Sequence, residues 1–386
     1  MNILWIPQIS CQSSAGEVLL EKDSNITFLK KLLNTELFTK NNVFIAFEFE
    51  GKEVIAFKKE IESKYDNIKI LSDRGRFRGA FYERFNFDFD FYKKIKNYYN
   101  IDVVFVNEPT KALPLGFIFG QSLIVSYIHW LAYDNMPYLV YNQIGGIKAS
   151  DIIFVNSRYV KNSIFKYGDL NEDLQRMHVF YPPCNDFEEY KGKMTNNIIY
   201  NHRLSSDEYY MGAFRSLLKV CNILEEEIGV VNMPKIYFTN PSGKDVSKLM
   251  KEKPYFELKE FDTEKAYKNF LKYNVGFHLN TFFDSKGMWS SSTTDCIENC
   301  VIPLLPNKYG YREILNEKYE GYCCNEEDMA CILKKYLNLG KEDREKLIED
   351  VQRYTSHLEA KEIGAKVNSL ISKELKVIRG VCHNVR

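Results

Sequence analysis

The chain has 386 residues, enough for two domains, and equal numbers of basic and acidic side chains, 52 of each, so its net charge is zero. This balance neither favours nor excludes a polyanionic partner, because the distribution of charge matters more than its total. No apolar run reaches the ~18 residues that a membrane span needs, and no signal peptide is recognisable, so we expect a cytoplasmic protein without membrane association. The nine scattered cysteines include no pair of CxxC motifs, which indicates reduced thiols rather than a zinc site.

Apolar runs of strand length alternate with helical stretches along the first half of the chain. Alternation of this kind predicts an α/β domain with a parallel, doubly wound sheet, in which ligands bind beyond the carboxyl ends of the strands. The sequence Tyr-Pro-Pro at 181–183 ends this series. The predicted strands are Asn2–Pro7, Val43–Phe49, Ile68–Leu71, Asp102–Val106, Leu123–Ile128, Asp151–Val155 and His178–Phe180.

A second α/β series follows, with strands predicted at Asn197–Tyr200 and Lys235–Thr239 and a long helix between them. From about Glu342 the sequence is charged and helical, and we expect a loose tail from about Arg379. The predicted domains are therefore 1–182 and 183–356, followed at 357–386 by a C-terminal helix and tail, for which packing back on the first domain is one option.

The second domain is organised around the stretch Val275–Tyr311. An apolar run, a polar loop, a helix that begins near Ser290 and a second apolar run form a βαβ unit. The N-terminus of that helix is a potential anion site, because its first N–H groups have no partner within the helix. Asp295, which we expect in the first turn, is placed to accept a hydrogen bond from a ribose hydroxyl.

Asn201, His202 and Arg203 directly follow the first strand of the second domain. An arginine at the carboxyl end of such a strand can bind a diphosphate through two parallel hydrogen bonds. The alternative is a surface arginine in a loop. The helix start at 290–295 lies in the same predicted domain, and together the two features favour a phosphate site.

Two features follow strands of the first domain. His129 and Trp130 directly follow the apolar strand that ends at Ile128. His129 is either a catalytic residue or a core histidine with one hydrogen bond, and the sequence leaves both interpretations open. Small residues, Ser13 to Gly16, follow the first strand and would let a substrate approach the backbone. They do not form a GxGxxG motif, so a dehydrogenase-type dinucleotide site is disfavoured.

Basic and aromatic side chains are interleaved between residues 69 and 96. This combination suits a nucleic-acid backbone with a stacked or flipped base. The alternative is a solvated helix over an aromatic core, with acidic neighbours cancelling much of the charge. The basic residues are Arg74, Arg76, Arg78, Arg84, Lys93, Lys94 and Lys96, and the aromatic residues are Phe77, Phe81, Tyr82, Phe85, Phe87, Phe89, Phe91 and Tyr92.

Together, these segments resemble the retaining, family-4-like glycosyltransferases with the GT-B fold. Ser150–Gly168 (SDIIFVNSRYVKNSIFKYG) resembles the end of their first domain, and Asp295–Ile314 resembles the segment that holds the donor nucleotide. Ile198–Leu204 (IIYNHRL) resembles the NHRW entry to the donor domain in the tRNA-queuosine mannosyltransferase group, with Leu204 in place of Trp. The strand before His129 is similar to one in the T-even phage α-glucosyltransferases of hydroxymethylcytosine DNA.

The resemblance implies two Rossmann-like domains facing across a cleft, with the donor mainly on the second and the acceptor on the first. It implies that a sugar, glucose from UDP-glucose above all, is transferred with retention to a hydroxyl, without a metal or any cofactor beyond the nucleotide-sugar co-substrate. His129 and Arg203 would be the catalytic residues. The implied donor-binding residues are Asn201, His202, Arg203, Lys286, Gly287, Ser291, Ser292, Thr293, Thr294 and Asp295, and the acceptor-binding residues are Ser14, Gly16, Arg74, Arg76, Arg78 and Trp130.

The sequence departs from the family pattern in three places. Met211 stands where a lysine usually shares the diphosphate charge, and Lys286 or Arg215 is a potential substitute. Gly287 stands at the first glutamate of the E-x7-E pattern. The small-residue loop at 13–16 replaces a glycine-rich loop.

For the acceptor, the basic and aromatic segment and the phage-like strand favour a modified DNA base such as a 5-hydroxymethylpyrimidine. The protein would then be a phage-type, DNA-binding enzyme acting in the host cytoplasm. A tRNA base is the nearest alternative, followed by a polysaccharide or lipid-linked glycan. A non-catalytic nucleotide-sugar binding protein and a sugar-phosphate epimerase of the same two-domain type also stay open.

Overall fold

The computed structural model describes residues 1–9, 18–75, 77–79, 86–128, 137–164, 176–200, 208–239, 246–282 and 289–384. The chain forms two compact units. Unit 1 comprises Met1–Pro183 together with Leu358–Arg386, and unit 2 comprises Cys184–His357. Within the described ranges, no helix combines the length and the apolar character needed to cross a membrane.

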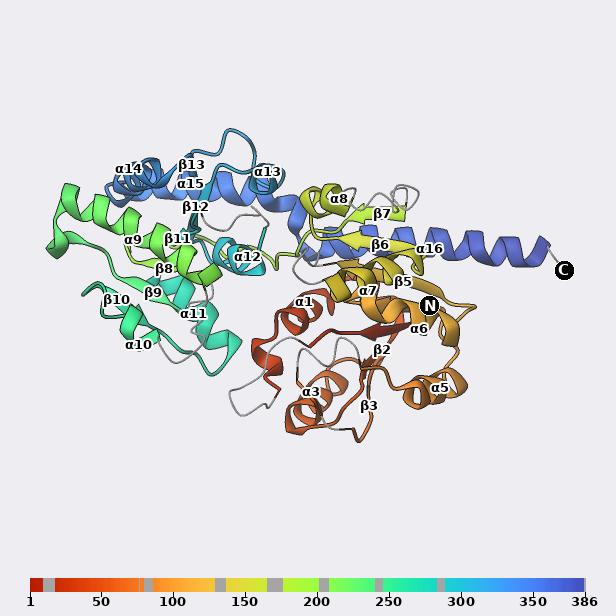
Figure 1. The fold of residues 1–386 in the computed structure, drawn as a ribbon. Helices are drawn as coiled ribbons and strands as arrows, with labels where there is room; N and C mark the ends of the chain where they lie inside the picture. Colours follow the sequence, from red (N-terminus) through yellow and green to blue (C-terminus); the bar gives the residue numbers. More distant parts are fainter. Residues whose placement is uncertain are drawn as a thin grey trace. The chain divides into compact units, whose positions relative to one another are not determined.

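Unit 1 is a parallel sheet with helices on both faces (Figure 1). Its strands are β1 (Asn2–Ile6), β2 (Asn42–Phe47), β3 (Ile68–Ser72), β4 (Val103–Val106), β5 (Leu123–Ile128), β6 (Ile152–Val155) and β7 (Met177–Val179). Its helices are η1 (Leu20–Lys22), α1 (Ser24–Leu32), α2 (Glu36–Thr39), α3 (Lys52–Glu62), α5 (Phe89–Tyr98), η2 (Pro109–Lys111), α6 (Ala112–Ile118), α7 (Pro137–Lys148), α8 (Arg158–Ile164) and α16 (Ala360–Asn384).

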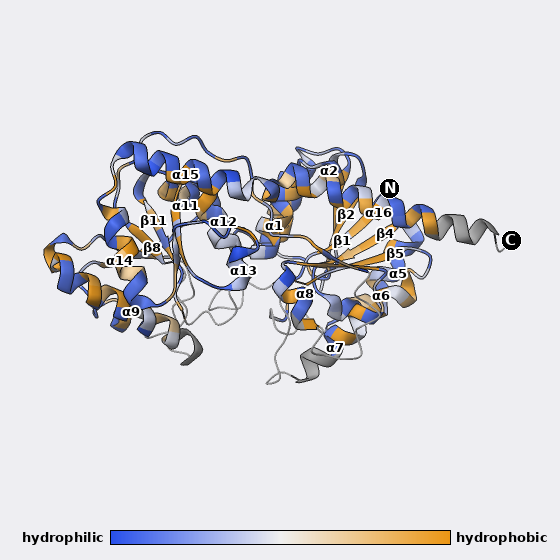
Figure 2. Cartoon of the chain, turned by 90° about the horizontal axis from the view of Figure 1, so that it is seen from above, coloured by the Kyte–Doolittle hydropathy of each residue, from blue (hydrophilic) through white to orange (hydrophobic). Residues whose placement is uncertain are grey.

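Among the described residues, the strands of unit 1 lie in the order β3-β2-β1-β4-β5-β6-β7, and every neighbouring pair is parallel. Successive side chains of a strand point to opposite faces, so β1 serves two cores. Ile3 and Trp5 pack with α1, α2 and α3, whereas Leu4 and Ile6 pack with α5 and α6. Strands buried on both faces explain the near-continuous apolar runs of the sequence, and Figure 2 shows β1, β2, β4 and β5 in hydrophobic orange.

The C-terminal helix α16 packs on unit 1. Ile363, Val367, Ile371 and Leu375, spaced four residues apart, join the core on the face of the sheet that α1, α2 and α3 cover. The prediction of a loose tail from Arg379 is wrong in one respect, because the helix continues to Asn384. Gly380, directly after Arg379, is a potential helix end by its chemistry, but no proline follows it and the helix continues through the glycine.

Unit 2 is a second parallel sheet with helices (Figure 1). Its strands are β8 (Ile198–Tyr200), β9 (Ile236–Phe238), β10 (Phe256–Leu258), β11 (Phe277–Leu279), β12 (Ile302–Pro306) and β13 (Tyr322–Cys323). Its helices are α9 (Glu208–Ile228), η4 (Val230–Asn232), α10 (Val246–Leu249), α11 (Glu264–Asn274), α12 (Ser291–Glu298), α13 (Tyr309–Arg312), α14 (Glu326–Leu337) and α15 (Lys341–Thr355), and η5 (Ser356–Leu358) leads back to unit 1.

The described strands of unit 2 lie in the order β10-β9-β8-β11-β12-β13, again parallel throughout. Phe277 and Leu279 of β11 pack against α9 and α14 on one face of the sheet. On the other face, Ile199 and Tyr237 pack with Leu271 of α11 and Cys296 of α12. Because β8, β11 and β12 are parallel neighbours, their carboxyl ends meet at one edge of the sheet, which we call the carboxyl edge.

Candidate functional site

The carboxyl edge of unit 2 contains two buried polar residues directly after β11. Asn280 and Thr281 are both fully buried. The Nδ2 atom of Asn280 donates to the hydroxyl of Tyr311 at 2.6 Å. Among the described residues, however, Oδ1 of Asn280 and Oγ1 of Thr281 have no hydrogen-bond partner. Buried polar atoms are nearly always paired in folded proteins, so these two oxygens mark a place where a water molecule or a ligand group can supply the missing hydrogen bonds.

The start of α12 lies in the same βαβ unit and is firmly built. Ser290 is its N-cap, and its hydroxyl accepts from the backbone N–H of Thr293 at 3.2 Å. The same hydroxyl lies 2.8 Å from Oγ of Ser292 and 2.9 Å from Oγ1 of Thr293. Trp289, which is 2% exposed, donates from Nε1 to Oγ1 of Thr294 at 2.8 Å. The indole therefore anchors the end of the preceding loop in the core and fixes where the helix begins.

The first N–H groups of a helix have no acceptor within it, and the helix dipole adds about half a positive charge at this end. An N-terminus of this kind binds anions. Thr293 and Thr294 are fully buried and their hydroxyls bond within the protein, whereas Ser291 and Ser292 are half-buried. Of the four predicted donor-binding hydroxyl residues 291–294, the two serines are therefore more accessible to a ligand than the two threonines.

The prediction that Asp295 lies in the first turn of this helix is wrong. The helix begins at Ser291, so Asp295 is its fifth residue, and the first turn contains no acidic side chain. Any of the residues 290–293 could serve as N-cap by its chemistry, and the anchored indole of Trp289 selects the earliest one. The outcome suits an anion site, because no carboxylate of the first turn competes with the ligand.

Residues after β12 brace the same edge. Lys308 donates to the backbone oxygen of Phe282 at 3.0 Å, which ties the loop after β12 to the loop after β11. Tyr311 is buried and holds Asn280, so its ring is part of the scaffold, while Tyr309 is exposed. Tyr311 therefore has a structural role at this edge.

Several sequence-predicted site residues fall outside the described residues, so the structure does not place them. The described part does place Met211, which is half-buried and packs against the core of unit 2, and Arg215, which is exposed on α9. The predicted residues that lie outside the description are Ser14, Gly16, Arg76, His129, Trp130, Asn201, His202, Arg203, Lys286 and Gly287.

The basic and aromatic segment of unit 1 resolves into two parts. Phe91 and Tyr92 are buried in the core, Phe87 stacks on Tyr92 with ring centroids 4.9 Å apart, and Phe77 packs against Phe49. These four rings therefore pack in or against the core rather than forming a stacking surface, whereas Phe89 of α5 is 49% exposed. The basic side chains of the described part are exposed, namely Arg74, Arg78, Lys93, Lys94 and Lys96.

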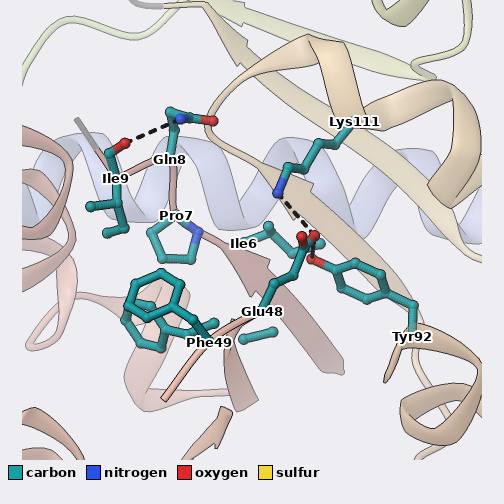
Figure 3. A pocket seen from close by; sticks show the side chains of 10 residues that line it. Ile6, Pro7, Gln8, Ile9, Glu48, Phe49, Tyr92 and Lys111 are labelled. Atoms are coloured by element: carbon teal, nitrogen blue, oxygen red, sulfur yellow. Dashed lines mark hydrogen bonds and ion pairs between the residues drawn. The ribbon is translucent and has the colours of Figure 1, made fainter. Parts of the chain in front are cut away.

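Unit 1 has a polar cluster at its own carboxyl edge that the sequence prediction missed. Glu48 follows β2, and its Oε1 accepts from the hydroxyl of Tyr92 at 2.8 Å and from Nζ of Lys111 at 2.9 Å (Figure 3). The sheet grows outward in opposite directions from the pair β1 and β4, so this is its topological switch point, where α/β sheets bind ligands. Glu48 lay inside the predicted strand Val43–Phe49, and the signal that could have found it is a single charged residue near the end of an apolar run.

A glycine contact holds Lys111 in place. Gly146 of α7 packs so closely on η2 that a Cβ atom built on it would lie 1.7 Å from the backbone oxygen of Pro109. Only glycine permits this approach, which fixes the short helix that ends at Lys111.

Among the residues that the structure describes, no group of three or more His, Cys, Asp and Glu side chains could hold a metal ion.

Comparison with known proteins gives a fold but no family. No protein-family model matches this chain, and no curated protein matches it in sequence. Among solved structures, HepE (Alr3699) of Anabaena in complex with UDP and glucose matches with a TM-score of 0.66 at 11% identity, over 97% of this chain and all of that one. A glycosyltransferase from Rickettsia africae matches with a TM-score of 0.65 at 13% identity, over 97% of this chain and 98% of that one.

A UDP-forming α,α-trehalose-phosphate synthase from Burkholderia vietnamiensis matches with a TM-score of 0.64 at 9% identity, over 97% of this chain and 99% of that one. The predicted fold class is thus confirmed, with two parallel, Rossmann-like sheets of the GT-B kind. At these identities the likeness concerns the fold alone.

Proposed function

We propose that this protein is a glycosyltransferase that transfers the sugar of a UDP-sugar, UDP-glucose in the first instance, to a hydroxyl of an acceptor. The observation that carries the proposal is the start of α12, an anchored helix N-terminus without a first-turn carboxylate, in the βαβ unit where Asn280 and Thr281 present unpartnered buried oxygens. The fold adds support, because solved structures that share it contain UDP or UDP-glucose.

In the proposed reaction, the diphosphate of the donor binds at the first N–H groups of α12 and at Arg203. The bond between C1 of the sugar and the diphosphate oxygen breaks, and the acceptor oxygen bonds to C1 on the same face. The acceptor proton passes to the leaving diphosphate, so atoms and charge balance and no separate protein base is required. We propose that the helix N-terminus and the arginine stabilise the leaving group electrostatically, without a metal ion. His129 stays a candidate catalytic residue.

Two acceptor classes each have a specific observation in their favour. The exposed lysines of α5 suit the phosphates of DNA carrying a hydroxymethylpyrimidine, or of a tRNA, and the exposed ring of Phe89 on the same helix suits a stacked base, although Phe91 and Tyr92 are buried. An acceptor with a sugar hydroxyl is favoured by Glu48 in unit 1, because Oε2 of its carboxylate has no hydrogen-bond partner among the described residues and carboxylates accept hydrogen bonds from hydroxyl groups. The fold neighbours include trehalose-phosphate synthases, whose product is a sugar phosphate.

The test is turnover of UDP-glucose by the purified protein with a panel of acceptors. The panel contains hydroxymethylcytosine DNA, hydroxymethyluracil DNA, unmodified tRNA, neutral hexoses and hexose phosphates. UDP release is measured together with the mass of the acceptor, after digestion to nucleosides where it is a nucleic acid. A hexose-sized gain on one acceptor identifies the reaction.

Arg203→Ala should abolish turnover. Arg353→Ala, which removes an exposed arginine paired with Asp350 on α15, should leave it unchanged. If UDP-glucose binds but is turned over neither with an acceptor nor by water, the protein is a nucleotide-sugar binding protein instead. If UDP-glucose does not bind at all, the proposed function fails.

A further inference from the structure

Unit 1 contains a buried carboxylate of which only one oxygen is used. The side chain of Glu48 is 2% exposed and that of Lys111 is 10% exposed. Oε1 of Glu48 accepts hydrogen bonds from the hydroxyl of Tyr92 and from Nζ of Lys111. Oε2 is buried and has no hydrogen-bond partner among the described residues. A buried carboxylate oxygen left without a donor is costly, because it has lost its hydrogen bonds to water and gained none in return.

The position of this oxygen is that of a ligand site. Glu48 is the first residue beyond β2, and Lys111 closes the turn after β4, so the two side chains come from opposite sides of the switch point between β1 and β4. A cavity of about 10 Å³ adjoins them, lined also by the chain that leaves β1, Pro7 to Ile9 (Figure 3). That volume holds one oxygen atom, either of a water molecule or of a single hydroxyl group.

The chemistry of the cluster selects the ligand group. With Lys111 at ion-pair distance and the phenol of Tyr92 donating to it, Glu48 is a carboxylate and can only accept hydrogen bonds. The complementary group is a neutral hydroxyl. A phosphate or carboxylate of a ligand would meet the negative charge of Glu48 and is excluded from this position.

We propose that Oε2 of Glu48 binds one hydroxyl of a neutral sugar moiety that is the acceptor of the transfer reaction, with Tyr92 and Lys111 as positioning residues that hold the carboxylate in place. The inference rests on the proposed glycosyltransferase function and names the acceptor class. A hexose phosphate remains compatible only if its phosphate lies away from this carboxylate. The competing explanation is a structural ion pair beside a trapped water.

The experiment measures thermal stability of the full chain with neutral sugars, both with and without saturating UDP. A ligand that binds the folded state raises the melting temperature by mass action. D-Glucose, D-mannose and D-galactose are the probes, and at least one should raise the melting temperature of the wild-type protein. Glu48→Gln should need at least a tenfold higher concentration of that sugar for the same rise, while its response to UDP stays that of the wild type.

Glu36→Gln is the matched control, because Glu36 forms an exposed ion pair with Lys40 in the same unit, and it should respond to sugars like the wild type. The inference is overturned if none of the three sugars stabilises the wild-type protein, or if Glu48→Gln responds to them like the wild type. Absence of a UDP response in the wild type would instead refute the proposed donor site, and the sugar series without UDP would still decide the present question.

A double variant covers the case in which Glu48→Gln does not fold. Glu48→Leu with Lys111→Met replaces the buried ion pair by apolar side chains of similar volume, a change that proteins often tolerate. The double variant should fold, keep its response to UDP and lose its response to the sugar. A response to the sugar equal to that of the wild type would show that the pair is structural.

Discussion

Two substitutions at Ser290 separate the structural role of α12 from its proposed role in donor binding. Ser290→Ala removes the N-cap, which costs about 1 kcal/mol of unfolding free energy. It also removes the partner of the Thr293 hydroxyl, a fully buried group 2.9 Å away, at about 1–2 kcal/mol more. For a domain of the size of unit 2, a loss of about 2–3 kcal/mol lowers the melting temperature by about 4–12 °C.

Ser290→Asp keeps the cap, because a carboxylate accepts from the N–H of Thr293 and is stabilised by the helix dipole. The melting temperature should therefore stay close to that of the wild type. The new charge would lie beside the proposed diphosphate, and two negative charges ~5 Å apart repel by about 3 kcal/mol near a protein surface. The dissociation constant of UDP should rise about a hundredfold, as measured by isothermal titration calorimetry. A folded Ser290→Asp variant that binds UDP like the wild type would refute the placement of the diphosphate at this helix.

Two further predictions concern packing and pH. Gly146→Ala should lower the unfolding free energy, measured by urea denaturation, by at least about 2 kcal/mol, because the new Cβ would lie 1.7 Å from the backbone oxygen of Pro109. Gly145→Ala is the control and should be neutral or stabilising, because the space around its Cβ is open. Equal effects of the two substitutions would contradict the packing. Burial lowers the pKa of Lys193 to about 8 from its usual 10.5. Between these pH values the unfolded chain binds the extra proton, so the stability of the wild type relative to Lys193→Met should rise with pH, by at most about 3 kcal/mol and less after solvent screening. Denaturation at pH 7.5 and 10.5 tests this, and a difference independent of pH would contradict it.

Much of the fold could be predicted because the strands of a parallel sheet are buried on both faces. Their apolar runs are visible without any knowledge of tertiary contacts, as β5 (Leu123–Ile128) shows by matching its predicted bounds. Neither β10 nor β13 was predicted from the sequence. The first has a glutamate, Glu257, at its centre, and the second is only two residues long, so neither forms an apolar run. The order of the strands depends on contacts between distant segments, which local patterns do not contain.

The candidate site was predictable to a smaller degree. The hydroxyl-rich run after Trp289 predicted the start of a helix, but which of its residues is the N-cap depends on how the indole of Trp289 packs. Glu48 was missed because the apolar pattern continues through it to Phe49, which is buried although β2 ends before it. Its pairing with Lys111 joins residues that only the folded sheet brings together.

The central claim, that a UDP-sugar binds at the carboxyl edge of unit 2 against α12, is tested most directly by amide hydrogen exchange of the full chain with and without UDP. A bound diphosphate would engage the first N–H groups of the helix, so exchange in the segment 290–295 should slow by at least tenfold, while α5 in unit 1 stays unchanged. Binding of UDP with no added protection at 290–295 would contradict the account.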